Sequence, residues 1–207
     1  MTDVHRRRLG VVLFPVFELL DVFGPLEMFG ILQDRIELVT VAERPGPVTS
    51  AQGPQVVATH SFADCPPLEL LLVPGGFGTR IEATNAPLID FVRARAKQAE
   101  LTMSVCSGSL LLAAAGLLDG RRATTNKMFF GEISAAVPAV NWVREARWVE
   151  DGPFVTSSGV SAGIDMALAV IAKLFGEKTG DELALATEYE WHRDAAWDPF
   201  ARAHGLV

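Results

Sequence analysis

Residues 101–118 read LTMSVCSGSLLLAAAGLL, and the rest of the chain is arranged around them. The apolar run that ends at Val105 is typical of a buried strand, and the Leu- and Ala-rich run over residues 110–118 is typical of a helix. Only residues 106–108, Cys-Ser-Gly, separate the two runs. A strand that turns so directly into a helix exposes the residue at the turn. The pattern therefore predicts a nucleophile elbow with Cys106 at its tip.

The same turn has consequences for the chemistry of the thiol. The first N–H groups of a helix and the helix dipole favour negative charge, so we expect the Cys106 thiol to be biased toward thiolate. The backbone N–H groups of Ser107 and Gly108 are candidate donors to the same pocket. The alternative is that Cys106 is a small buried side chain that fills a strand end. The small residues that follow it favour catalysis, because they let a ligand approach the sulfur.

Strands and helices alternate along the chain, which predicts one layered α/β domain over residues 1–207 with a mostly parallel sheet. We expect strands at residues 9–14, 36–41, 68–73, 101–105, 122–125, 143–149 and 154–157, and helices at 85–99, 110–118, 126–136, 161–175 and 179–190. A further helix near residues 19–29 is expected to kink or restart at Gly24-Pro25. Residues 45–55 suit a hairpin, and Asn85 suits an N-cap.

Composition and charge exclude several classes of protein. Of the 207 residues, 49% are hydrophobic, so a real core is expected, and the net charge of −7 argues against a nucleic-acid-binding surface. No apolar stretch reaches the roughly 20 residues of a membrane span. The basic start, with His5 and three arginines, is better explained as the approach to a first strand than as a targeting signal. Two cysteines make no disulfide framework, so we expect a reducing, cytoplasmic location.

A cysteine nucleophile needs donors for developing charge and a nearby acid or base. Gly75 and Gly76 follow a core strand and are candidate donors, although a plain tight turn explains them as well. Asp21 sits among apolar residues, where burial would raise its pKa. Local sequence slightly favours the other interpretation, an exposed Asp at a helix start. Glu27 is a competing carboxylate, and we expect it to be solvated.

The remaining chemically active side chains are expected to be inert. The four histidines are interpreted as surface residues rather than as bases: His5, His60, His192 and His204. Glu188 and His192 have the spacing of two metal ligands on one helix face, but no third ligand has a diagnostic spacing. We therefore predict neither a metal nor another cofactor. Cys65 lies in a proline-rich segment and is expected to be packing.

Several blocks of the chain together resemble the ThiJ/PfpI superfamily, within the class I glutamine amidotransferase-like fold, and in particular its isocyanide hydratase branch. These blocks are LFPVFELLDVFGPLEMF, SFADCPPLELLLVPGGFG, SVCSGSLLLAAAGLLDGRRATTN, SSGVSAGIDMAL and ATEY, and they cover nearly the full length. The resemblance implies a flavodoxin-like three-layer sandwich. It also implies a homodimer with active sites near the interface, and a small-molecule substrate.

The resemblance also assigns roles to residues. It places the nucleophile at Cys106 and a carboxylate that hydrogen-bonds its sulfur at Asp21, against the interpretation that local sequence favoured. It places the glycine pair that helps to bind developing negative charge at Gly75 and Gly76. Ser107 stands where isocyanide hydratases have threonine.

The resemblance also places a helix beginning near Gly159 and Val160 beside the cysteine. Two departures from the family pattern concern specificity. Many relatives have a histidine after the Ala-Thr-Thr run, where this chain has Asn126, which cannot titrate near neutral pH. The C-terminal segment also differs. Packing is the expected role for each of Trp191, Trp197 and Phe200 singly, and the alternative is that the set walls a pocket or seals a dimer and alters substrate choice.

The leading hypothesis is therefore an isocyanide-hydratase-like enzyme that acts through a covalent thioimidate on Cys106, with Asp21 managing the proton. One alternative is a redox-responsive or protective protein with an oxidisable Cys106. A glyoxalase or amidase-like hydrolase is disfavoured by Asn126. A transcriptional regulator with an appended helix-turn-helix is not expected, because the chain ends about where the first domain should.

Overall fold

A computed structural model describes residues 6–207, so the prediction for His5 lies outside the described residues. Its centre is a seven-stranded sheet of order β10-β11-β7-β6-β1-β2-β5. All pairings are parallel except β10 with β11. The chain runs outward from β1 to β2 and then returns to place β6 on the other side of β1, so the topological switch point lies between β1 and β6. Open α/β sheets bind ligands at such a point.

The strands of the described chain are β1 (Arg7–Val12), β2 (Ile36–Ala42), β3 (Gly46–Thr49), β4 (Gln55–Ala58), β5 (His60–Ser61), β6 (Leu70–Val73), β7 (Leu101–Ser104), β8 (Arg122–Ala123), β9 (Asn141–Trp142), β10 (Trp148–Asp151) and β11 (Phe154–Ser157). The helices are α1 (Leu19–Gly30), α2 (Thr79–Glu82), α3 (Ala86–Ala96), α4 (Gly108–Ala114), α5 (Phe130–Ala136), α6 (Ala162–Phe175), α7 (Glu177–Ala186) and α8 (Pro199–Ala203).

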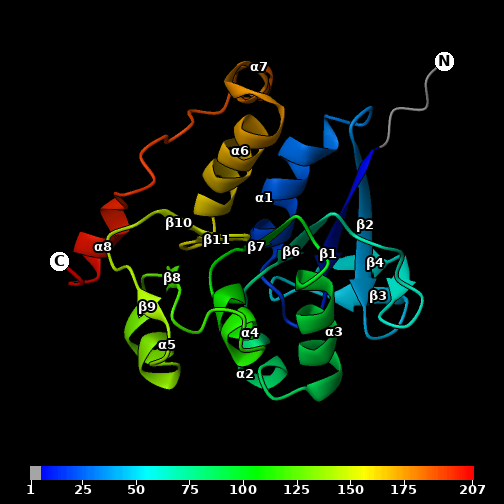
Figure 1. Ribbon diagram of the computed structural model, residues 1–207, viewed down its shortest axis with the longest axis horizontal. Helices are drawn as coiled ribbons and strands as arrows, with labels where there is room; N and C mark the ends of the chain where they lie inside the picture. Colours follow the sequence, from blue (N-terminus) through cyan, green and yellow to red (C-terminus); the bar gives the residue numbers. More distant parts are fainter. Residues whose placement is uncertain (1–5) are drawn as a thin grey trace.

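The central strands are buried on both faces because helices cover both. Every residue of β6, β7 and β11 is buried, which explains the continuous apolar run of β6. Helices α1, α6 and α7 lie on one face, and α2, α3 and α4 lie on the other (Figure 1). This arrangement confirms the three-layer, flavodoxin-like α/β sandwich. Among residues 6–207, no helix has the length and apolar character needed to cross a bilayer.

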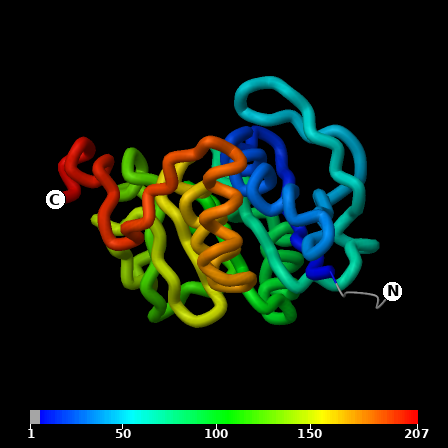
Figure 2. The backbone as a smooth tube through the Cα atoms, turned by 90° about the horizontal axis from the view of Figure 1, so that it is seen from above, coloured from blue at the N-terminus to red at the C-terminus, as the bar shows by residue number. Residues whose placement is uncertain are grey.

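Two smaller features lie outside the main sheet. The expected hairpin is confirmed as β3 and β4, and in Figure 2 it projects from the body on the side opposite the C-terminus. The strand expected at residues 122–125 is only β8, which pairs with β9 in a separate two-stranded sheet. These strands lead into and out of α5, which therefore stands beside the carboxyl edge of the main sheet (Figure 1).

Several helix boundaries differ from the predictions. Helix α1 continues through Pro25 as one helix and does not restart there. Asn85 lies at the N-cap position of α3 in an extended conformation, but its side chain donates to Glu82 instead of capping the helix. Helix α4 begins two residues earlier and α5 four residues later than expected, and α8 was not predicted. Short helices whose ends depend on tertiary packing are the elements that local patterns place least well.

The elbow depends on a close contact between α4 and β6. A Cβ atom on Gly108 would lie 2.2 Å from the Val73 carbonyl oxygen, whereas one on Gly131 would meet nothing within 4 Å. We expect Gly108→Ala to lower the free energy of unfolding by about 3 kcal/mol, because backbone cannot yield as a flexible side chain does. Gly131→Ala in helix α5 is the matched control and should be neutral or stabilising by up to about 1 kcal/mol. Urea unfolding measures both, and equal stabilities would contradict the packing described.

Candidate active site

Cys106 occupies the turn between β7 and α4 with a φ of 57°, a left-handed conformation that non-glycine residues rarely adopt. Its backbone N–H donates to the Ser158 carbonyl at 2.9 Å, which fixes the turn against the end of β11. Such a conformation costs about 1–3 kcal/mol and clusters at functional sites. The side chain is mostly buried and lines a cavity. The predicted elbow is therefore present, with its sulfur at a cavity surface.

Three N–H groups converge on the sulfur. The Asn126 side-chain amide donates to Sγ at 3.1 Å. The backbone N–H groups of Ser107 and Val160 also lie close enough to the sulfur to favour the thiolate, so all three groups lower the pKa of Cys106. Thus the side chain that replaces the histidine of many relatives faces the sulfur directly as a donor.

Asp21 is fully buried in the first turn of α1, not exposed as local sequence favoured. Its Oδ2 accepts a 2.8 Å hydrogen bond from the Gly75 N–H. Its Oδ1 is buried and has no partner of good geometry among the described residues, and the Cys106 thiol is the donor close enough to lower the pKa of the carboxyl in part. Burial dominates and raises the pKa of Asp21 well above its usual value. The competing carboxylate, Glu27, is exposed.

The expected bias of Cys106 toward thiolate is wrong for the resting site. Burial, and next the charge of Asp21, raise the pKa of Cys106 to about 12, which outweighs the three N–H donors. The α4 helix is only seven residues long, so its dipole cannot offset this loss of solvent. Because both groups resist ionisation, at most one negative charge resides on the pair near neutral pH.

The candidate backbone donors are partly occupied. Gly75 donates to Asp21, Gly76 donates to the Ser107 Oγ at 3.1 Å, and Gly108 donates to the Val105 carbonyl at 2.9 Å. These three N–H groups are therefore engaged within the fold. Glycine at position 75 instead allows the backbone to pack closely against its neighbours. A Cβ on Gly75 would lie 2.6 Å from the Ser107 nitrogen and 2.8 Å from the Asp21 Oδ2.

Beside the sulfur lies a cavity of about 190 Å³. Cys106, Ser107, Asn126 and Val160 form its inner end. Gly76, which was predicted as a site residue, also lines this cavity. The other lining residues were not predicted from the sequence, and they are Glu18, Phe77, Thr79, Arg80, Leu110, Met128, Phe129, Glu132 and Ile133. Most come from α2 and α5 and the turns before them, which only the folded chain brings to one place. Most of the side chains that line the cavity are apolar, and Glu18, Arg80 and Glu132 are charged.

Behind the site lies a buried ionic network that was not predicted from the sequence. Arg147 pairs with Asp165 at 2.6 Å and with Asp198 at 3.7 Å, and all three are buried. Asp198 precedes α8 and accepts from the hydroxyl of Ser158, whose carbonyl holds Cys106. The adjacent Lys127 is buried, and burial lowers its pKa to about 8. The network therefore ties the C-terminal segment to the loops around the sulfur.

The C-terminal aromatic residues have separate positions. Trp191 packs against Gly180 of α7, and the Arg193 guanidinium lies 3.9 Å above its ring. Trp197 is half-exposed and stacks on His192, while Phe200 lines a second small cavity that also borders Asn126 and Val160.

The other side chains with chemical potential lie apart from the sulfur. His60 and His204 do not line its cavity, and Cys65 is a buried free thiol. Within residues 6–207, no group of three or more His, Cys, Asp or Glu side chains is placed to hold a metal ion.

Fold and site together define an α/β protein with a cysteine at a nucleophile elbow. The model of the DJ-1/PfpI family matches residues 7–173, and the chain belongs to this family. It is 39% identical to an isonitrile hydratase of Pseudomonas putida over 184 residues, 88% of this chain and 78% of that protein.

Two other proteins are also similar to this chain. A crystal structure of a ThiJ/PfpI family protein from Pseudomonas syringae is 35% identical, with a TM-score of 0.84, and the match covers 91% of this chain and 77% of that one. The HTH-type transcriptional regulator CdhR of Pseudomonas aeruginosa is 32% identical over 131 residues. This match covers 63% of this chain and only 38% of the regulator.

Asp21→Asn should lower the pKa of Cys106, because it removes a neighbouring negative charge that opposes the thiolate. Each unit of decrease gives about ten times more thiolate at any pH below the pKa. The pH profile of Cys106 alkylation by iodoacetamide should therefore shift to lower pH. Glu27→Gln removes an exposed carboxylate from the same helix and should leave the profile unchanged. A profile for Asp21→Asn at or above that of the wild type would contradict the electrostatic account.

Arg147→Met should lower the free energy of unfolding by about 3–5 kcal/mol, because it leaves two buried carboxylates without their cation. The matched control is Arg121→Met, which breaks the half-exposed pair with Asp151 and should cost less than about 1 kcal/mol. Chemical denaturation of the two variants compares them. Similar small losses would show that the buried network does not hold the C-terminal segment.

Proposed function

We propose that this protein is an isocyanide-hydratase-like hydro-lyase that converts a small isocyanide and water into an N-formamide. The observation that carries the proposal is that Cys106 lines an apolar cavity and has the buried carboxyl of Asp21 behind it. The identity of 39% to an isonitrile hydratase supports the substrate class. We treat residues 1–207 as one domain of this kind.

The proposed first step is addition of the Cys106 thiol to the terminal carbon of the isocyanide. The sulfur forms a bond to carbon, and the thiol proton passes through Asp21 to the same carbon, which gives a thioimidate. A carboxyl with a raised pKa suits this role, because it holds a proton more firmly than an ordinary aspartate does and can both accept and release one. The N–H groups of Asn126, Ser107 and Val160 stabilise the sulfur as its proton leaves.

In the proposed second step, Asp21 takes a proton from water as the water oxygen bonds to the thioimidate carbon, and it passes that proton to the substrate nitrogen. The carbon–sulfur bond then breaks as the new hydroxyl group becomes the formamide carbonyl. The hydroxyl proton returns to the sulfur, and the N-formamide leaves. The sum is one isocyanide plus one water, so the reaction needs no redox cofactor. Gly75 contributes by fixing the Asp21 carboxyl through its N–H.

The alternatives fit these observations less well. Susceptibility of a cysteine to oxidation increases with thiolate character and exposure, and burial lowers both at Cys106. A glyoxalase-like or amidase-like mechanism lacks a histidine at Asn126. Part of the chain is similar to an HTH-type transcriptional regulator. The chain's net charge of −7 argues against a surface that binds nucleic acid.

The proposal includes a homodimer in the cytoplasm. Leu20 and Phe23 expose 41% and 46% of their surface on α1, the helix that carries Asp21, and Val16 adds 42% beside them. Apolar side chains gathered in this way suit an interface between two copies near the site. Both cysteines are free, which is compatible with the reducing compartment that we propose.

The direct test is turnover of an aryl isocyanide by the purified protein, with the N-formamide measured by chromatography. We expect Cys106→Ala to abolish turnover and Asp21→Asn to lower kcat by about 10²-fold or more, the usual contribution of a general acid–base. Cys65→Ala removes the other thiol and should retain activity. Absence of formamide from the wild type, or equal rates in Cys106→Ala, would overturn the proposal.

A further inference from the structure

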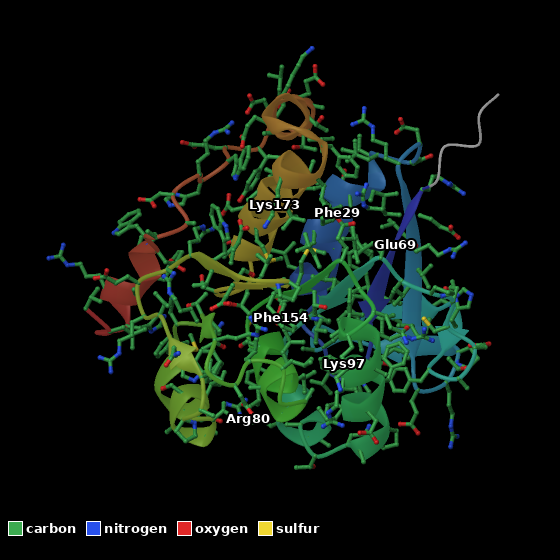
Figure 3. The ribbon with its side chains drawn as sticks, in the orientation of Figure 1. Phe29, Glu69, Arg80, Lys97, Phe154 and Lys173 are labelled. Atoms are coloured by element: carbon green, nitrogen blue, oxygen red, sulfur yellow. The ribbon has the colours of Figure 1, made fainter. Side chains whose placement is uncertain are left out.

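An ion pair spans the rim of the cavity. Arg80 of α2 donates from Nε and Nη2 to the two carboxylate oxygens of Glu132 on α5, at 2.9 and 2.8 Å. Both residues line the cavity that holds Cys106. Figure 3 labels Arg80 in the space between α2 and α5. A bidentate pair of this kind is the geometry in which arginine binds carboxylates most specifically.

Two aromatic rings hold the guanidinium in this position. It lies 4.8 Å from the centre of the Phe129 ring and 5.6 Å from that of Phe77, and the two rings meet edge to face at 6.0 Å. Both phenylalanines also line the cavity. Arg80 is thus fixed on an aromatic platform with its carboxylate-binding edge occupied by Glu132.

The charges around the cavity oppose an anionic ligand. Its lining contains the carboxylates of Glu18 and Glu132 and the single cation of Arg80, and Asp21 lies just behind. A ligand carboxylate would have to displace Glu132 from Arg80 and leave that side chain without its partner. A neutral apolar ligand meets the rings of Phe77 and Phe129 and displaces nothing.

We propose that Glu132 is a specificity-determining residue: by occupying Arg80, it makes the Cys106 cavity select neutral electrophiles over those that carry a carboxylate. This role of Glu132 extends the proposed function, and it rests on that function only in taking the electrophile to be an isocyanide. Without Glu132, the same arginine presents a free carboxylate-binding edge to the cavity. The Glu132 side chain therefore decides whether Arg80 is neutralised or acts as an anion receptor.

The test uses two nearly isosteric alkylating reagents, neutral iodoacetamide and anionic iodoacetate. Their rates at Cys106 are measured at one pH by peptide mass spectrometry, and their ratio cancels any change in the ionisation of the thiol. We expect the wild type to favour iodoacetamide, and Glu132→Gln to shift the ratio toward iodoacetate by about five- to tenfold. Arg80→Gln should shift it the opposite way, and the double variant should lose the gain of Glu132→Gln.

Glu150→Gln is the matched control, because it removes the same charge from a 2.8 Å pair with Lys173, which lies on the α6 side of the sheet in Figure 3. Its ratio should equal that of the wild type, as should the ratio at Cys65 in every variant. An unchanged ratio in Glu132→Gln, or an equal shift in Glu150→Gln, would overturn the proposal. Because alkylation requires no hydration, a shifted ratio in a protein that forms no formamide would leave this inference standing and reject only the isocyanide.

Discussion

The hydrogen bond from the Gly75 N–H to the Asp21 Oδ2 is the interaction on which the site depends. It joins the turn after β6 to the first turn of α1, across the point where the strand order reverses. It also holds a fully buried carboxyl beside the sulfur of Cys106. Gly75 is required because a Cβ would collide with both Asp21 and Ser107. Removing the carboxyl from water raises its pKa and makes it able to carry a proton.

The surroundings divide the remaining tasks. Asn126, Ser107 and Val160 point N–H groups at the sulfur, while the ionic network of Arg147 and Asp198 holds the loops that supply two of these donors. The Arg80–Glu132 pair between α2 and α5 has no role in the proposed proton transfers. The residues proposed to carry out the reaction and those proposed to select the substrate thus lie on different elements. Substrate selection could therefore change without a change in the reaction.

Local sequence patterns correctly predicted the features of the fold that depend on neighbouring residues. The elbow at Cys106 follows from an apolar strand that meets a helix with almost no loop, and the alternation of elements gives the parallel sheet. These patterns did not suffice for Asp21, whose burial depends on α1 packing against α6. They also could not reveal that Gly76 donates to Ser107, or that Arg80 meets Glu132 across 52 positions of sequence. Both contacts depend on side-chain placement that only the complete fold determines.

The central claim is that burial raises the pKa of Asp21 well above its usual value, and carbon NMR of the Asp21 carboxyl tests it most directly. The resonance is assigned in ¹³C-labelled protein by its loss in Asp21→Asn and is then followed with pH. The account predicts a midpoint well above the ordinary value of about 3.9 for aspartate. A midpoint at or below that value would show an ordinary carboxylate and contradict the account.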